Sequence, residues 1–161
     1  MNFENFKKDL AIYQPEKIIF VGLGNESRGD DYAGILFLEE LKKRSEFINS
    51  KFLSVGTNPE NYLFQLTKNE IDVIVFIDAV QTNSSPGKIM WLAPDQIEMI
   101  AISTHSFSIK MVEQYINSIR PAEFKYLGIT AVSYEYGKPV SQMILNSITD
   151  FFNEWKLLEK R

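Results

Sequence analysis

The sequence predicts an α/β protein, a three-layer α/β/α domain with a mixed five-stranded sheet in which one strand is antiparallel. Lys17–Leu23 and Asp72–Asp78 have the continuous apolar character of parallel strands that are buried on both faces. Only Ala79–Pro86 separates the second of them from a further strand, Gly87–Leu92. These eight residues are too few for a crossover helix, so the Gly87–Leu92 strand is expected to be antiparallel.

The N-terminal half supplies the first strands and helices. Residues 1–15 are expected to form an N-terminal arm, either loose or as a short helix. After the first strand, apolar residues at helical spacing predict a helix over Asp31–Arg44. Lys51–Val55 is predicted as a strand, and Pro59 suits the first position of a helix that runs to Leu66.

The C-terminal half continues the pattern to the end of residues 1–161, which are expected to form one domain. Ser106 precedes a predicted helix over Phe107–Ile119, and Phe124–Ile129 is the fifth strand. The apolar face of that helix is expected to comprise Val112, Tyr115, Ile116 and Ile119. Ser141 is expected to cap a final helix. Its apolar positions are Ile144, Ile148, Phe151, Phe152, Trp155 and Leu158.

Composition excludes several kinds of chemistry. The chain has no cysteine and one histidine, which excludes disulfides, a thiolate nucleophile and zinc motifs that need two imidazoles. Its formal net charge of −4 argues against nucleic acid as a partner. The apolar runs are too short to cross a membrane, and no signal peptide is visible, so a cytoplasmic location is expected.

Polar residues follow the predicted strands where an open α/β sheet binds its ligands. Asn25, Asp30 and Asp31 come after the first strand, Asp78 closes the third, and His105 precedes a helix. Two carboxylates and an imidazole would suit a borderline divalent cation such as zinc or nickel. The sequence therefore offers a metal site as one interpretation of these residues.

Other interpretations stay open at this point. Asp30 and Asp31 would also serve as caps of the helix that follows them, and a lone histidine is more often structural than a ligand. A serine hydrolase could use His105 with Ser103 or Ser106, although the chain has no GxSxG motif. Gly22-Leu23-Gly24 lacks the third glycine of a dinucleotide-binding turn.

A series of short motifs is more specific than any of these residues alone. In chain order they are Val21–Asn25, Gly29–Asp31 with Ala33-Gly34, Asn58–Asn61, Ile77–Ala79, Pro86-Gly87, Ser103–His105 and Leu127–Ile129. Together they resemble the motifs of the hydrogenase maturation endopeptidases, which finish the large subunit of [NiFe] hydrogenases. The resemblance extends from about Lys17 to the final helix.

The resemblance implies a metal-dependent endopeptidase, classed as aspartic-type, that removes a C-terminal extension from the large-subunit precursor after nickel has been inserted. It implies that Asp31, Asp78 and His105 recognise Ni²⁺. The substrate would carry this ion, and other divalent cations would be able to substitute. The implied partner is the [NiFe] hydrogenase large-subunit precursor, and the chain is expected to act as a monomer.

The catalytic nucleophile stays unassigned, and supporting roles are expected for Asn25 and Asp30. Asn25 or the backbone N–H groups of the glycine-rich turn would stabilise an oxyanion. Two positions depart from the family pattern: Tyr32 replaces a frequent glycine, and Thr130 begins a loop that often reads Gln-Pro. A non-catalytic α/β binding module that has kept the fold is the alternative from another functional class.

Overall fold

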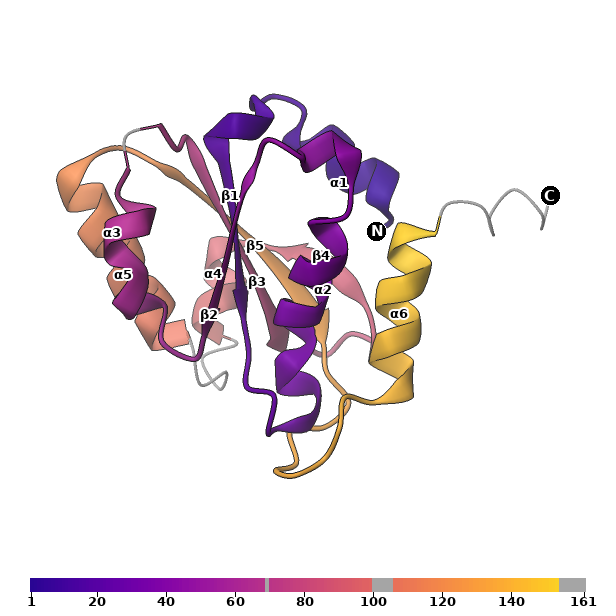
Figure 1. Ribbon diagram of the computed structural model, residues 1–161. Coiled ribbons are helices and arrows are strands. Elements are labelled where there is room, and N and C mark those ends of the chain that lie inside the picture. Colours follow the sequence, from indigo (N-terminus) through magenta and orange to yellow (C-terminus); the bar gives the residue numbers. More distant parts are fainter. Residues whose placement is uncertain (69, 100–105, 154–161) are drawn as a thin grey trace.

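The computed structural model describes residues 1–68, 70–99 and 106–153 (Figure 1). Its strands are β1 (Ile18–Leu23), β2 (Lys51–Gly56), β3 (Val73–Val80), β4 (Ile89–Leu92) and β5 (Glu123–Thr130). They form a five-stranded sheet in the order β2-β1-β3-β5-β4. All neighbouring strands are parallel except β4 and β5, which confirms the predicted mixed sheet and its antiparallel strand.

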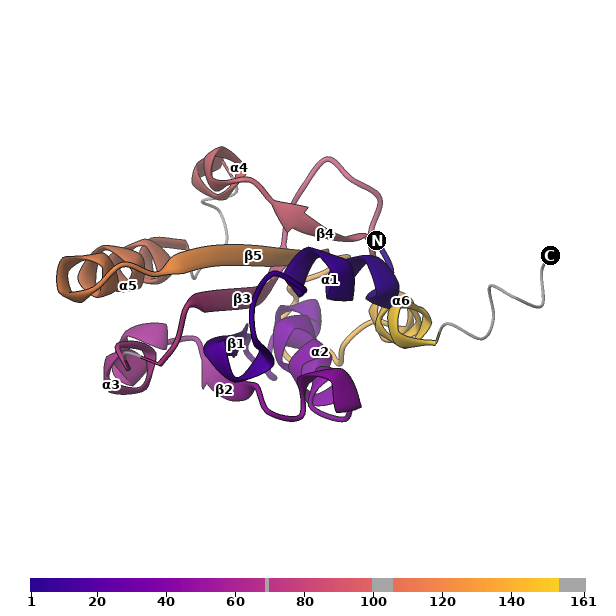
Figure 2. The ribbon, with the colours of Figure 1, turned by 90° about the horizontal axis from the view of Figure 1, so that it is seen from above.

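Helices cover both faces of this sheet. The α-helices in the described ranges are α1 (Phe3–Leu10), α2 (Ala33–Leu41), α3 (Leu63–Leu66), α4 (Pro94–Met99), α5 (Ser106–Ile119) and α6 (Gln142–Phe152). Short 3-10 helices are η1 (Pro15–Lys17), η2 (Gly29–Tyr32), η3 (Ser45–Phe47) and η4 (Pro59–Tyr62). Figure 2 shows the sheet between α1, α2 and α6 on one side and α3 and α5 on the other. No helix in the described ranges is long and apolar enough to span a membrane.

The central strands bury both of their faces, which explains their continuous apolar sequences. Every residue of β1 and β3 is buried. Because successive side chains of a strand point to opposite faces, Ile18 and Phe20 pack under α1, α2 and α6, whereas Ile19 and Val21 pack under α3 and α5. Two hydrophobic cores therefore share one sheet.

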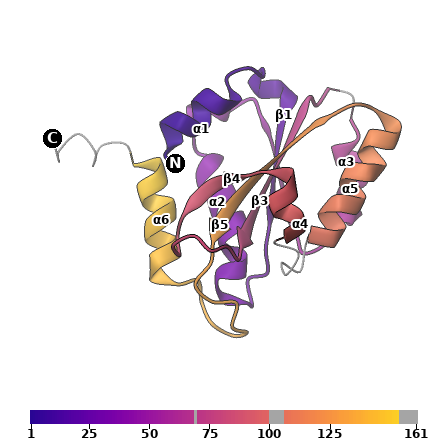
Figure 3. The ribbon, with the colours of Figure 1, turned by 180° about the vertical axis from the view of Figure 1, so that it is seen from behind.

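The N-terminal segment forms a helix that packs on the core. Of the two predicted alternatives, the short helix is confirmed and the loose arm is wrong. The ring of Phe6 on α1 is fully buried. Its centroid lies 6.1 Å from that of Phe20 on β1 and 5.8 Å from that of Phe151 on α6. Figure 3 shows α1 beside α6. The contact between the Phe6 and Phe151 rings joins the two ends of the described chain. This helix ends at Leu10, before Pro15.

Several predicted boundaries change in the structure. β3 continues two residues beyond Asp78, because Asp78 pairs with Gly128 within the parallel β3–β5 ladder. The predicted helix over Asp31–Arg44 begins as the 3-10 helix η2 and becomes α-helical only from Ala33. The short helix α4 was not predicted.

The apolar face predicted for α5 is only partly correct. Val112 and Ile116 are buried, but Tyr115 and Ile119 are about half exposed, because the packed face of this helix is narrower than its apolar spacing suggests. In α6 the four predicted core positions up to Phe152 are buried, and Trp155 and Leu158 lie outside the described residues.

Candidate functional site

The first turn of α2 packs directly on the carboxyl ends of β1 and β3. A Cβ atom at Gly34 would lie 2.4 Å from the Leu23 carbonyl oxygen and 2.3 Å from the Ile77 carbonyl oxygen. Such distances are shorter than van der Waals contact, so only glycine fits at this helix position. The close packing brings η2, and the acids that it carries, against the end of β3.

Two of the predicted metal ligands lie at this edge of the sheet. Asp31 belongs to η2 and is 3% exposed, and Asp78 belongs to β3 and is 6% exposed. Gly24 makes room for η2: it has φ +152°, and a Cβ there would lie 2.3 Å from the Asp31 carbonyl oxygen. Burying carboxylates is costly, and acids buried at the carboxyl ends of strands are typical of a functional site.

Asp30, the neighbour of Asp31, is an anchor for the loop between β5 and α6. Its carboxylate accepts backbone N–H bonds from Val132 at 2.8 Å, from Ser133 at 3.1 Å and from Ser141 at 2.7 Å. The Ser141 hydroxyl adds a fourth bond at 3.1 Å. The side chain of Asp30 is 1% exposed, so these donors replace the water that its charge would otherwise bind.

This network corrects two sequence interpretations. Asp30 does not cap the following helix, because its carboxylate bonds to residues more than 100 positions away in the chain. Ser141 does occupy the N-cap position of α6, but its side chain makes no capping bond and reaches Asp30 instead. In the structure Asp30 positions a loop, and its expected supporting role in catalysis stays a prediction.

Backbone bonds hold the same two segments together. Asp30 N–H donates to Ser133 O at 2.9 Å, and Gly29 N–H donates to Lys138 O at 3.0 Å. Gly137 N–H donates to Ser27 O at 2.7 Å. In Figure 1 this loop, in orange, lies beside the start of α2 at the bottom of the view. The loop from β5 to α6 is thus part of the edge that carries Asp31 and Asp78.

Tyr134 in this loop is a residue that the sequence interpretation missed. Its hydroxyl oxygen is buried and has no hydrogen-bond partner among the described residues. Burial raises the pKa of the Tyr134 phenol, and the carboxylates of Asp78, Asp31 and Asp30 raise it further, against the opposing charge of Arg28. The phenol therefore lies within electrostatic range of all three acids. No local motif marks this residue in a polar loop.

Asn25 shapes the loop that follows β1. Its side-chain oxygen accepts the Ser27 N–H at 2.9 Å, and its carbonyl accepts the Arg28 N–H at 3.1 Å. This is the Asx-turn geometry that asparagine favours. The side-chain oxygen is thus engaged in the loop, and the NH₂ group is the part of Asn25 suited to an oxyanion. Its supporting role stays a prediction.

The departures from the family pattern have local structural explanations. Tyr32 has φ −83° and ψ −3°, a conformation open to any residue, so the helix start does not need glycine there. Thr130 is 3% exposed, and its hydroxyl forms a 3.0 Å hydrogen bond with that of Thr82. A threonine at this position therefore ties the end of β5 to the loop that follows β3.

The predicted histidine ligand, His105, lies outside the described residues, and so do Ser103 and Thr104. Within residues 1–68, 70–99 and 106–153, no group of three or more His, Asp or Glu side chains is placed to hold a metal ion. The set Asp31, Asp78 and His105 therefore stays a prediction. The same is true of the serine hydrolase alternative.

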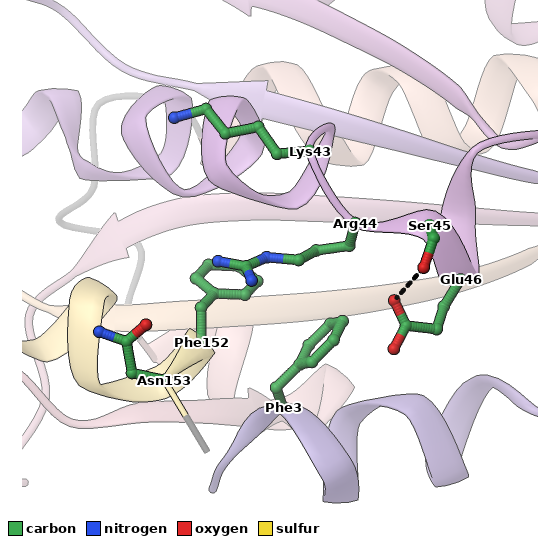
Figure 4. A pocket seen from close by; sticks show the side chains of 7 residues that line it. All are labelled: Phe3, Lys43, Arg44, Ser45, Glu46, Phe152 and Asn153. Carbon is green, nitrogen blue, oxygen red and sulfur yellow. Dashed lines mark hydrogen bonds between the residues drawn. The ribbon is translucent and has the colours of Figure 1, made fainter. Parts of the chain in front are cut away.

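A surface hollow of about 350 Å³ lies elsewhere in the fold. Figure 4 shows its lining residues, Phe3, Lys43, Arg44, Ser45, Glu46, Phe152 and Asn153. The Arg44 guanidinium carbon lies 4.7 Å from the centre of the Phe152 ring, a cation–π arrangement. Lys43 and Arg44 follow the C-terminal end of α2, whereas Asp31 precedes its start, so this hollow and the acids lie at opposite ends of that helix. Of the predicted site residues that the structure describes, Asn25, Asp30, Asp31 and Asp78, none lines this hollow.

The sequence is similar to those of known hydrogenase maturation proteases. The sequence model of the family described as "Hydrogenase maturation protease" matches residues 35–155, a segment that includes positions 78 and 105. The chain is 26% identical to the hydrogenase 3 maturation protease of Escherichia coli (strain K12) over 132 residues, which cover 81% of this chain and 83% of that protein.

Solved structures have the same fold. The [NiFe] hydrogenase maturation protease HycI from Thermococcus kodakarensis KOD1 superposes with a TM-score of 0.70 at 27% identity. The endopeptidase HycI from Escherichia coli superposes with a TM-score of 0.67 at 25% identity. Both alignments cover 83% of this chain and 85% of the other.

Proposed function

The chain belongs to the hydrogenase maturation protease family, and from this premise we propose that it cleaves the C-terminal extension from a nickel-loaded [NiFe] hydrogenase large-subunit precursor. Asp31, Asp78 and His105 recognise the nickel, which arrives as part of the substrate. The observation that carries the proposal is the pair of buried acids, Asp31 and Asp78, in a chain of this family.

The chemistry of the acids supports nickel as the recognised ion. A site that combines carboxylates with one imidazole suits Ni²⁺ better than a site of oxygen ligands alone. Two carboxylates that lie 3% and 6% exposed gain from a cation, because it offsets the cost of burying their charges. The protein would then position the scissile amide against the metal.

The cleavage itself is the addition of water to a peptide bond. A bond forms between the water oxygen and the amide carbon, the carbon–nitrogen bond breaks, and the amine product takes a proton. The chain contains no cysteine, so no thioester forms on this enzyme. The Asn25 NH₂ group or the N–H groups near Gly24 would stabilise the negative oxygen that develops during the attack.

The test is incubation of the full chain with nickel-loaded and nickel-free precursor, with truncation measured by intact mass. Truncation of the nickel-loaded form alone is expected. Asp31→Asn, Asp78→Asn and His105→Ala should each lower the rate by roughly two orders of magnitude or more. Asp150→Asn is the matched control, because Asp150 is exposed on α6, and it should process at the wild-type rate.

Other outcomes separate the alternatives. Equal processing of both precursor forms would overturn nickel recognition but not the protease activity. Binding of the precursor without truncation of either form would favour the non-catalytic module. If His105→Ala processed nickel-loaded precursor at the wild-type rate, His105 would have no part in recognising the metal.

A further inference from the structure

We propose that Tyr134 is a positioning residue for the nickel-recognition site and that its hydroxyl donates a hydrogen bond to the Asp78 carboxylate when the substrate metal binds. This inference rests on the proposed function of Asp31 and Asp78. It assigns a role to the loop between β5 and α6, which contributes no residue to the predicted ligand set.

The Tyr134 hydroxyl is a buried polar group in the loop between β5 and α6. Its oxygen is buried and has no hydrogen-bond partner among the residues that the structure describes. A buried polar group without a partner is costly, and such a group in a native protein calls for an explanation, such as a functional role or a bound ion. The ring itself packs against the apolar core, so the cost falls on the hydroxyl alone.

Negative charge surrounds this hydroxyl. Burial raises the pKa of the Tyr134 phenol, and the negative charges of Asp78 and Asp31 raise it further. A tyrosine carries its proton at neutral pH, and neighbouring carboxylates oppose its loss. Tyr134 is therefore a neutral hydrogen-bond donor within electrostatic range of the proposed ligands, and it is neither a base nor an anionic ligand.

Hydrogen bonds to Asp30 hold the loop that carries Tyr134. The Asp30 carboxylate bonds to the N–H groups of Val132 and Ser133, which immediately precede Tyr134 in the chain. Asp30 is buried and precedes Asp31 in the chain, so these bonds hold Tyr134 in a fixed position relative to the segment that carries Asp31. Metal-ligating carboxylates usually accept a further hydrogen bond that orients them, and this is the bond that the proposal assigns to the Tyr134 hydroxyl.

The variant Tyr134→Phe tests the role, because it removes the hydroxyl and keeps the ring. Tyr136→Phe is the matched control, since Tyr136 lies in the same loop and is 76% exposed. Two measurements are made on the full chain: Zn²⁺ affinity by NMR titration, and kcat/KM for nickel-loaded precursor. We expect Tyr134→Phe to lower each by roughly three- to tenfold, and Tyr136→Phe to change neither.

Thermal unfolding separates positioning from simple packing. Without metal, the Tm of Tyr134→Phe should equal or slightly exceed that of the wild type, because the variant no longer buries a hydroxyl that has no partner among the described residues. A lower Tm with unchanged Zn²⁺ affinity would overturn the inference in favour of a structural role. Unchanged affinity and unchanged processing would overturn it as well.

The two proposals fail in different ways. If the wild type did not cleave the precursor but Tyr134→Phe still weakened Zn²⁺ binding, the proposed function would fail and the positioning role would stand. If the wild type cleaved nickel-loaded precursor and Tyr134→Phe matched it in both measurements, the positioning role alone would fail.

Discussion

Ser141 donates two hydrogen bonds to Asp30, one from its backbone N–H at 2.7 Å and one from its hydroxyl at 3.1 Å. The relationship joins the segment before α2 to the residue before α6. Asp31 is the next residue along the chain, so the bonds that hold the loop also fix the position of a proposed ligand. Loop and ligand are therefore expected to respond together to changes at Asp30.

Asp30→Asn should lower the free energy of unfolding by about 2–3 kcal/mol. Both carboxylate oxygens of Asp30 accept hydrogen bonds, so in either orientation of the asparagine amide its NH₂ group would face a donor and lose at least one bond. Urea unfolding followed by circular dichroism measures this change. Asp150→Asn, at an exposed position of α6, should stay within about 0.5 kcal/mol of the wild type. Equal effects of the two variants would contradict the anchoring role of Asp30.

Gly34→Ala should destabilise the protein by about 3 kcal/mol or more, although alanine favours helices in general. The added Cβ would meet the carbonyl oxygens of Leu23 and Ile77 and push α2 from the sheet. Gly137→Ala is the comparison, because that glycine has φ +76° and open space around it, and its cost should be about 1–2 kcal/mol. Thermal unfolding of both variants gives the ranking, and the opposite order would refute the close packing of α2.

Glu113 on α5 should make stability depend on pH. Burial raises the pKa of this carboxyl from 4.5 to about 7, against the opposing charge of Lys110. Between those values the folded state binds more protons than the unfolded state, so the contribution of Glu113 to stability falls as pH rises from 4.5 to about 7.

The variant Glu113→Gln removes this contribution. It should be more stable than the wild type at about pH 8 and similar to it at about pH 4.5, as measured by urea unfolding across the range. Glu16→Gln, at an exposed position before β1, should leave the pH profile unchanged. A constant difference between Glu113→Gln and the wild type at every pH would rule out titration of Glu113 as the cause.

Arg44→Ala should reduce stability by about 1 kcal/mol, because the guanidinium loses its cation–π contacts with Phe152 at 4.7 Å and Phe3 at 5.8 Å. Precursor processing should be unchanged, since Arg44 lies at the end of α2 away from Asp31. Lys43→Ala is the control, because the neighbouring Lys43 side chain is 65% exposed. Its removal should have almost no effect on stability. A loss of processing in Arg44→Ala would connect this hollow to the function.

Much of the sheet could be predicted because the signals that specify it are local. The apolar runs of β1 and β3 reflect strands buried on both faces, and the short connection before β4 requires an antiparallel strand. The series of motifs identified the family, which the comparison confirms. Helix boundaries were predicted less accurately. The apolar pattern runs through both η2 and α2, so it does not show where the 3-10 helix ends and the α-helix begins.

The candidate site was only partly predictable. Position at strand ends singled out Asp31 and Asp78, and the structure buries both at one edge of the sheet. Their role with His105 in binding nickel stays a prediction. The sequence did not identify Tyr134, because its proposed role depends on the charges that act on its hydroxyl, and these charges come from residues far away in the chain.

The sequence by itself determined the order and type of the main elements, the antiparallel strand and the family, since each depends on residues that are neighbours in the chain. Only the tertiary structure decided that Asp30 anchors a loop and that Tyr134 lies beside the acids. The bonds responsible join residues 102 to 111 positions apart. No local pattern encodes such contacts, because they exist only after the strands have brought both segments to the same edge of the sheet.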